Sequence, residues 1–187
     1  MNLDRWTTAV ALGAFLALGA CDKGATTNDG APKTEAAKDA AGKDTIEDGL
    51  GDATKFGAAV KAAGLDATLS GPGPYTVLVP NDAAFDKLPA GTVDGLMKPD
   101  AKAELTGVLT YHVLPGTMLV SDIAKAVDAG EGKALIATMG GGTLTATKEG
   151  SDIVLSDASG TKAKIVGPDE KRSNGVIQRV DSVLMPS

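Results

Sequence analysis

The hydrophobic pattern of this chain changes its period once, near residue 130, and that change limits the folds open to it. Before this point apolar residues recur three and four positions apart, as in Phe56, Val60 and Ala63, which is the spacing of one helix face. After it, apolar and polar residues alternate, which is typical of strands with one buried face. Helices followed by a run of strands predict an α+β fold rather than alternating βαβ units.

Several short helices and one buried strand are predicted in the helical part. The first helix lies within residues 52–65, and Gly64 ends it. The Gly-Pro-Gly-Pro run at 71–74 then breaks the chain before an apolar strand at 75–79, which Pro80 closes. The residues expected to cap or head the later helices are Asn81 or Asp82, Thr92, Asp100 and Ser121.

The second part is predicted to be a series of strands joined by glycine-bearing turns. The turns lie at 140–142, 149–152 and 158–160. The charged run Asp-Glu-Lys-Arg at 169–172 is interpreted as a solvated turn and as an exposed polar contact patch. The predicted strands are residues 134–138, 143–147, 153–156, 162–166, 176–180 and 183–185.

Three stretches carry a resemblance to the fasciclin-like domain family. They are GPGPYTVLVPNDAAFDKLP at 71–89, LTGVLTYHVLPG at 105–116 and NGVIQRVDSVLMP at 174–186. They occur in the family's order, and the resemblance covers essentially all of residues 44–187. The resemblance implies a wedge-shaped β-sandwich with helices packed along one edge. It also implies that the domain contacts partners, as adhesive members of the family do.

Two positions depart from the family pattern. Gln178 stands where the family has a histidine after Asn-Gly-Val-Ile, and Glu170 stands where adhesive members have isoleucine after Pro-Asp. The resemblance implies four candidate partner-binding residues, which are Tyr111, His112, Pro168 and Asp169. From the residues alone, we expect His112, in the apolar stretch VLTYHVL, to be packed and hydrogen-bonded. We likewise expect Tyr111 to be buried with a satisfied hydroxyl.

The N-terminus predicts export and lipidation. Residues 9–20 are apolar and uncharged, a length that suits a signal-peptide core and falls short of a membrane span. We therefore predict a signal peptide at 1–20. It ends in Leu-Gly-Ala before Cys21, which resembles a bacterial lipobox with Cys21 as the lipid-attachment residue. An ordinary thiol after an ordinary signal peptide and an uncleaved helical anchor are the alternatives.

A polar segment links this cysteine to the domain. Residues 22–43 hold four acidic and four basic side chains and no aliphatic residue larger than alanine. Such a composition cannot bury enough apolar surface to offset the entropy of ordering. We predict that residues 21–43 are a lipidated cysteine and flexible tether, and that the folded domain is 44–187.

Composition excludes several classes of function. The net charge is -6 with a pI near 4.7, which argues against nucleic-acid binding. One cysteine and one histidine cannot supply a disulfide, a zinc cluster or the usual histidine metal sites. No Gly-x-Ser-x-Gly elbow, phosphate loop or calcium loop occurs. We expect no catalytic residues, no metal and no cofactor.

These observations predict a non-enzymatic lipoprotein on the membrane of a bacterial cell envelope, at its periplasmic face or the cell surface. The choice between inner and outer membrane stays open. Its expected role is adhesion, through contacts with an envelope protein or polysaccharide. The alternative is a carrier of an apolar small molecule, a carotenoid or a lipid, because the few aromatic residues of the domain would leave a mostly aliphatic groove.

Overall fold

The computed structural model describes residues 43–186. The predicted signal peptide, Cys21 and most of the tether lie outside the described residues, and so does Ser187. Within residues 43–186 no helix is long and apolar enough to cross a membrane.

Helices precede most of the strands along the chain, so the predicted α+β class is confirmed. The 3-10 helices are η2 (Glu47–Leu50) and η3 (Pro99–Ala101). The α-helices are α1 (Thr54–Ala63), α2 (Asp66–Ser70), α3 (Asp82–Asp86), α4 (Thr92–Leu96), α5 (Lys102–Tyr111) and α6 (Val120–Ala129). The strands are β1 (Tyr75–Pro80), β2 (Val113–Pro115), β3 (Lys133–Ala137), β4 (Thr143–Glu149), β5 (Asp152–Ser156), β6 (Lys162–Arg172) and β7 (Gly175–Val180).

The strands form one sheet in the order β2-β1-β7-β6-β5-β4-β3. Only β1 and β7 run parallel, and every other neighbouring pair is antiparallel. Strand β6 joins the β2-β1-β7 part of the sheet to the β5-β4-β3 part, since it pairs with β5 through its first residues and with β7 along the rest. A register shift between Val166 and Glu170, with Gly167 at φ 80°, interrupts the β6–β7 pairing.

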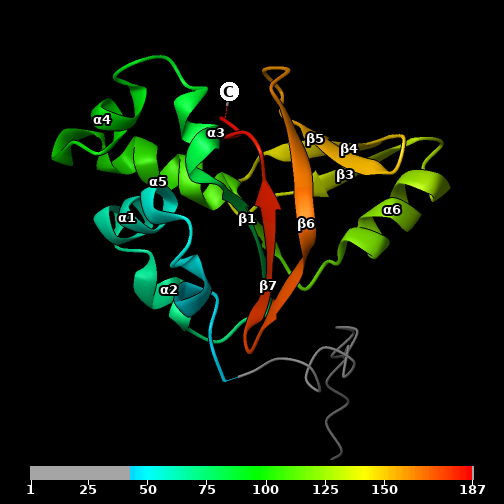
Figure 1. The fold of residues 1–187 in the computed structure, drawn as a ribbon, viewed down its shortest axis with the longest axis horizontal. Helices are drawn as coiled ribbons and strands as arrows, with labels where there is room; N and C mark the ends of the chain where they lie inside the picture. The colour runs from blue at the N-terminus through cyan, green and yellow to red at the C-terminus, as the bar shows by residue number, and fades with distance from the viewer. Residues whose placement is uncertain (1–42, 187) are drawn as a thin grey trace, which may run out of the picture. The chain divides into compact units, whose positions relative to one another are not determined.

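Two apolar cores lie on opposite faces of β1 and β7. Val77, Val79 and Ile177 pack against η2, α1, α2 and α5 on one face. Leu78 and Val180 point the other way, toward α6 and the inner face of β3, β4 and β5. Figure 1 shows α1–α5 on one side of the β1–β7 pair and β3–β5 with α6 on the other. Alternate residues of one strand therefore fill different cores.

The side chain of Asn174, in the β6–β7 turn, ties the start of the domain to the sheet. Its Oδ1 accepts a hydrogen bond from the backbone N–H of Ile46 at 2.8 Å, and its Nδ2 donates to the carbonyl oxygens of Leu69 and Gly71. The next residue must be glycine, because a Cβ at Gly175 would overlap the carbonyl oxygen of Tyr75 on β1.

The three predicted glycine turns are confirmed as the hairpins β3–β4, β4–β5 and β5–β6. Two other predictions are wrong. The run 169–172 is not a solvated turn, because it forms the last part of β6 and Glu170, Lys171 and Arg172 pair with β7. Residues 183–185 are not a strand, because their backbone hydrogen bonds go to side chains rather than to a neighbouring strand.

The helix ends follow the expected chemistry at α1 and α3 but not at α4, α5 and α6. Thr92 is the first residue of α4 and Asp100 lies in η3, and neither α4 nor α5 has a side-chain cap. Gly64 ends α1 in the left-handed conformation, and the side chain of Asn81 caps α3 by accepting from the backbone N–H of Ala84. The prediction that Ser121 caps α6 is wrong, because this helix begins at Val120 and Ser121 lies inside it. Its first amides are capped by carboxylates instead, one of them from β6.

Candidate functional site

The side chain of His112 lies between the end of α5 and the start of β2, and it is fully buried. Its Nδ1 lies 2.8 Å from the carbonyl oxygen of Val108, one helical turn earlier. Its Nε2 accepts a hydrogen bond from the backbone N–H of Leu184 at 3.1 Å. Because Leu184 can only donate, Nε2 carries no proton and Nδ1–H donates to Val108. Burial lowers the pKa of His112 to about 4, although the bond to Val108 and the charge of Asp157 oppose that shift.

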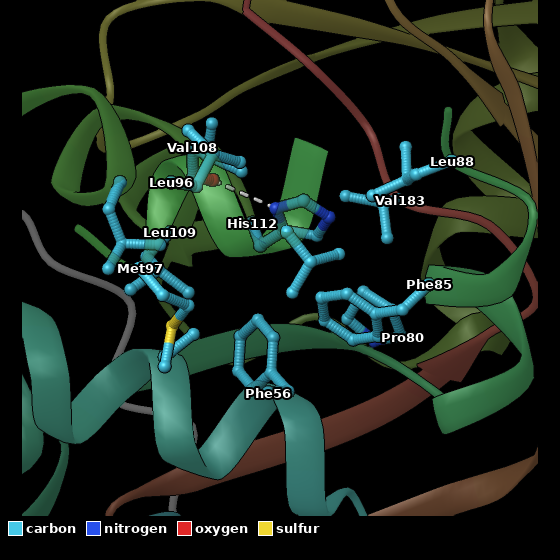
Figure 2. Close-up of a pocket in the computed structure, with 13 residues that line it drawn as sticks. Phe56, Pro80, Phe85, Leu88, Leu96, Met97, Val108, Leu109, His112 and Val183 are labelled. Atoms are coloured by element: carbon cyan, nitrogen blue, oxygen red, sulfur yellow. Dashed lines mark hydrogen bonds between the residues drawn. The ribbon is translucent and has the colours of Figure 1, made fainter. Parts of the chain in front are cut away.

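An apolar pocket lies beside the imidazole ring. Figure 2 shows His112 among side chains from α1, α3, α4, α5 and the C-terminal residues. The Phe56 ring meets the imidazole edge to face, with ring centroids 6.0 Å apart. The pocket's free volume is about 20 Å³, which is enough for about one water molecule. Its other lining residues are Ala59, Pro80, Phe85, Leu88, Val93, Leu96, Met97, Leu105, Val108, Leu109 and Val183.

Residues 183–186, which we call the C-terminal strap, close one side of this pocket. Val183 lines the pocket. Leu184 is fully buried in the core between the β1–β7 pair and α6 with β3–β5. The backbone N–H of Leu184 donates to His112, and that of Met185 donates to Oδ2 of Asp157 at 3.1 Å. Within the described residues, the backbone of the strap donates two hydrogen bonds. Both of them go to titratable side chains.

The carboxylate of Asp157, in the β5–β6 turn, is nearly buried and has several donors around it. Its Oδ1 accepts from the hydroxyl of Ser159 and the backbone N–H of Thr161, while Oδ2 accepts from Met185. Burial alone would raise the pKa of Asp157, but these hydrogen bonds outweigh it and hold the pKa below its usual value. The ionised carboxylate therefore joins the turn to the strap.

Tyr111 is buried next to His112, as expected. Its ring packs in the core that α6 and β3–β5 form with Leu78 and Val180. Its hydroxyl donates to the carbonyl oxygen of Thr143 at 3.3 Å. Burial and the charge of Asp157 raise the pKa of Tyr111. A Cβ at Gly142 would overlap the Tyr111 ring, so the glycine turn between β3 and β4 is the surface on which the ring rests.

Pro168 and Asp169 lie at the irregularity of β6, and only Pro168 is exposed. The Asp169 carboxylate accepts from the backbone N–H of Val120, at 3.1 Å to Oδ1, and so caps α6. Asp169 Oδ1 also accepts from Nε2 of Gln178 at 3.0 Å. Gln178 is fully buried on β7, and its Nε2 also donates to the carbonyl oxygen of Met118.

A second charged cluster spans β6 and β7. Glu170 accepts hydrogen bonds from Arg179, at 2.7 Å, and from Arg172, at 2.9 Å. Arg179 also donates to the carbonyl oxygen of Gly49 in η2. Burial alone would raise the pKa of Glu170, but the hydrogen bonds and charges of the two arginines outweigh it and lower the pKa. This cluster holds the N-terminal helices to the sheet.

The structure places the four candidate partner-binding residues in two separate settings. Tyr111 and His112 lie in the interior, whereas Pro168 and Asp169 lie beside the N-terminus of α6. No hydrogen bond within residues 43–186 links one pair to the other. Their role in binding a partner stays a prediction. Over the same residues, no group of three or more histidine, cysteine or acidic side chains is arranged to hold a metal ion.

Sequence reasoning missed Asp157, Gln178 and the Glu170 cluster. Gln178 had a signal, since it is a polar residue at an inward position of the apolar strand GVIQRV. The ion pair between Glu170 and Arg179 had none, because the two residues meet through pairing between β6 and β7 rather than through spacing along the chain.

The domain has an α+β fold in which the first strand, β1, and the last, β7, pair in parallel. A buried histidine accepts a hydrogen bond from Leu184. The Fasciclin domain family model matches residues 51–186. The chain therefore belongs to the fasciclin domain family, which confirms the resemblance found in the sequence.

Relatives and a solved structure agree with this assignment. Protein sll1483 of Synechocystis sp. is 38% identical over 163 residues, which cover 86% of this chain and 83% of that protein. The cell surface glycolipoprotein MPB83 of Mycobacterium bovis is 38% identical over 119 residues, or 64% of this chain. The match spans only 46% of MPB83, about half of its length.

The solved structure is a FAS1 domain pair from the insect cell adhesion molecule fasciclin I. It is similar to this chain with a TM-score of 0.55 and 19% sequence identity, over 73% of this chain and 46% of the other. At that level of identity the similarity shows the fold alone. It confirms the predicted fasciclin-like architecture.

Proposed function

We propose that this protein is a non-enzymatic fasciclin-domain lipoprotein, tethered to the bacterial cell envelope through Cys21, that makes adhesive contacts with envelope proteins or polysaccharides. The observation that carries the proposal is the order of parts. A fasciclin domain at 51–186 follows a polar segment, and that segment follows Leu-Gly-Ala-Cys at 18–21.

The relatives support a surface location and an adhesive role. MPB83 of Mycobacterium bovis is named a cell surface glycolipoprotein, and the structural neighbour comes from a cell adhesion molecule. A lipid at Cys21 would hold the domain near a membrane, because several acyl chains anchor a protein firmly. The 22 residues that follow would give the domain a reach on the order of 25 Å.

The buried histidine supports a role without catalysis. Both ring nitrogens of His112 are engaged, and its side chain is fully buried. A general base needs a free nitrogen within hydrogen-bond reach of its substrate. The exposed polar surface is therefore where we place the contacts, with Pro168 as the exposed member of the four candidate residues.

Fractionation of the native host tests the anchor. Wild-type protein should take up an acyl label and stay with the membrane, and Cys21→Ser should move to the soluble fraction without label. Thr27→Ser, in the same segment, is the matched control and should behave as wild type. A membrane-bound Cys21→Ser variant, together with an unlabelled wild type, would refute the lipid anchor.

A pull-down tests the adhesive role. The anchored protein, cross-linked in intact envelopes, should retrieve a specific protein or glycan that a Cys21→Ser variant retrieves less well. Retrieval of neither from envelopes that contain the protein at native levels would contradict adhesion.

The alternative function, carriage of a carotenoid or lipid, depends on the apolar pocket beside His112. Its composition suits an apolar molecule, but its volume of about 20 Å³ suits about one water molecule. A carrier would have to open this pocket. Mass spectrometry of protein from the native host decides the point, since a carrier would retain a bound apolar molecule and an adhesive protein would not.

A further inference from the structure

The C-terminal strap is held differently from the rest of the sheet region. Strands β1 to β7 are joined by backbone ladders, whose donors and acceptors do not titrate. The strap's two donated hydrogen bonds go to Nε2 of His112 and Oδ2 of Asp157. Protonation removes the first acceptor, since imidazolium has no free lone pair on its ring nitrogens, and weakens the second, since a protonated carboxyl is a poorer acceptor than a carboxylate.

The strap also covers the apolar pocket beside His112. Val183 packs on the pocket beside His112, opposite Val108 (Figure 2). Phe85 and Leu88 are half-buried against the cluster that contains Val183, so removing the strap would expose more of both side chains and bring water to Nε2 of His112. Closure of the strap therefore requires an unprotonated His112, and opening the strap allows His112 to be protonated.

We propose that residues 183–186 form an acid-released strap, in which protonation of His112 frees these residues and uncovers the apolar pocket that Val183 closes, and protonation of Asp157 at lower pH weakens the remaining hydrogen bond. This device is additional to the adhesive function proposed above and does not depend on it.

The groups around His112 favour release by acid. The α1 helix contributes Phe56, α5 contributes Val108 and Tyr111, and the strap contributes Leu184. Asp157 is the charged group that acts on the ring, and its field favours the imidazolium less strongly than burial disfavours it. The closed strap therefore keeps His112 neutral well below its ordinary titration range.

The groups around Asp157 act in the same direction. Its other donors, the hydroxyl of Ser159 and the N–H of Thr161, belong to its own turn, and Tyr111 faces it from α5. Protonation of Asp157 weakens the bond to Met185 while the bonds within the turn can persist. The strap is thus the part that acid detaches.

Charged groups before the strap form a fixed hinge. Nζ of Lys87 donates to the carbonyl oxygen of Asp181 at 2.7 Å, and the Asp181 carboxylate accepts from the backbone N–H of Lys164 at 2.8 Å. Burial alone would raise the pKa of Asp181, but the hydrogen bond from Lys164 and the neighbouring Lys87 outweigh it and lower the pKa. Residues before 183 therefore stay attached when the strap is released.

Hydrogen exchange of the full-length chain tests the proposal. The C-terminal peptide should open about tenfold more often for each pH unit between 6.5 and 4, after correction for intrinsic exchange. Peptides from β4 should stay protected, and fluorescence of 1-anilinonaphthalene-8-sulfonate should rise over the same range with unchanged far-UV circular dichroism. Simultaneous loss of protection in β4 and in the strap would show global unfolding and overturn the proposal.

Two variants identify the responsible group. In His112→Gln an amide oxygen can accept from Leu184 without titrating, so strap opening should no longer depend on pH between 6.5 and 4.5. Asp128→Asn, which changes an exposed carboxylate paired with Lys148, should keep the wild-type dependence. A His112→Gln variant with the wild-type dependence would overturn the proposal.

A measurement on the unmodified chain guards against a His112→Gln variant that does not fold. His112 is the single histidine of the chain, so its ring protons give an unambiguous NMR signal. Their titration should coincide with strap opening. Titration at an ordinary histidine value while the C-terminal peptide stays protected would equally refute the strap.

Discussion

Nε2 of His112 accepts a hydrogen bond from the backbone N–H of Leu184 across 72 residues of sequence. The donor cannot reverse its role, so the bond fixes both the tautomer and the charge of the ring. The packed, hydrogen-bonded histidine expected from the apolar stretch around it is thus a structural acceptor that ends α5 and holds residues 183–185.

The first prediction concerns the pH dependence of stability. His112 has a pKa of about 4 in the folded protein and about 6.5 when unfolded. The unfolded state therefore binds more protons between these values, so stability is full above pH 6.5 and falls as the pH drops toward 4. The loss should reach about 3 kcal/mol, measured by urea unfolding of the full chain at pH 4.5 to 7.5.

His112→Gln is the control for that measurement. It should be less stable than wild type at pH 7.5 but should lose less on acidification, because the remaining slope comes from carboxylates alone. Equal slopes for the two proteins would mean that the ring is protonated in the folded state and would contradict its assigned charge.

The second prediction separates Asp169 from its exposed neighbour. Asp169 caps α6 through the N–H of Val120 and receives a hydrogen bond from Gln178, whereas Pro168 is exposed. Asp169→Ala should lower stability by about 1–2 kcal/mol and speed amide exchange at Val120. Pro168→Ala should leave both within error in thermal and exchange measurements. A stable Asp169→Ala protein with an unprotected Val120 amide would disprove the energetic role of the cap.

How far the sequence predicts this fold depends on the range of the interactions involved. Local signals were sufficient for α1, for the cap at Asn81 and for the three glycine hairpins, because each is set by residues close together in the chain. The same holds for the burial of His112, which lies in a locally apolar stretch.

The predictions that were wrong depend on partners far away in the sequence. Ser121 looked like a cap, but the carboxylate that caps Val120 comes from Asp169, 49 residues later. The charged run at 169–172 looked like a solvated turn, but β7 pairs with it and Arg179 meets Glu170 there. Such contacts follow from sheet register, which alternation alone does not fix.

The third prediction concerns the cluster at Glu170. This carboxylate accepts hydrogen bonds from Arg172 and Arg179. All three side chains are less than one-third exposed. A double-mutant cycle with Glu170→Gln and Arg179→Gln should give a coupling energy of about 1–2 kcal/mol at pH 7. Because its pKa is lowered in the fold, Glu170 contributes stability above its unfolded value of 4.5 that is lost as the pH falls through the folded value.

The coupling should therefore shrink in urea unfolding below pH 4.5, where the unfolded chain protonates Glu170 more readily than the folded protein does. The pair Lys162 and Glu149, which is more exposed, is the control and should give a smaller coupling of about 0.5 kcal/mol. A Glu170–Arg179 coupling no larger than that of the exposed pair would remove the cluster as a link between the helices and the sheet.

The last prediction tests Gln178, which is fully buried with its Nε2 facing two acceptors, the carbonyl oxygen of Met118 and Oδ1 of Asp169. Gln178→Glu would set an unpaired charge against those acceptors and should cost about 3 kcal/mol or more at pH 7. Gln178→Met keeps the volume and only leaves the acceptors without a donor, so it should cost about 1–3 kcal/mol. Chemical denaturation of both variants at one pH gives the comparison, and an unchanged stability of Gln178→Met would mean that Gln178 acts through its shape rather than through its donor.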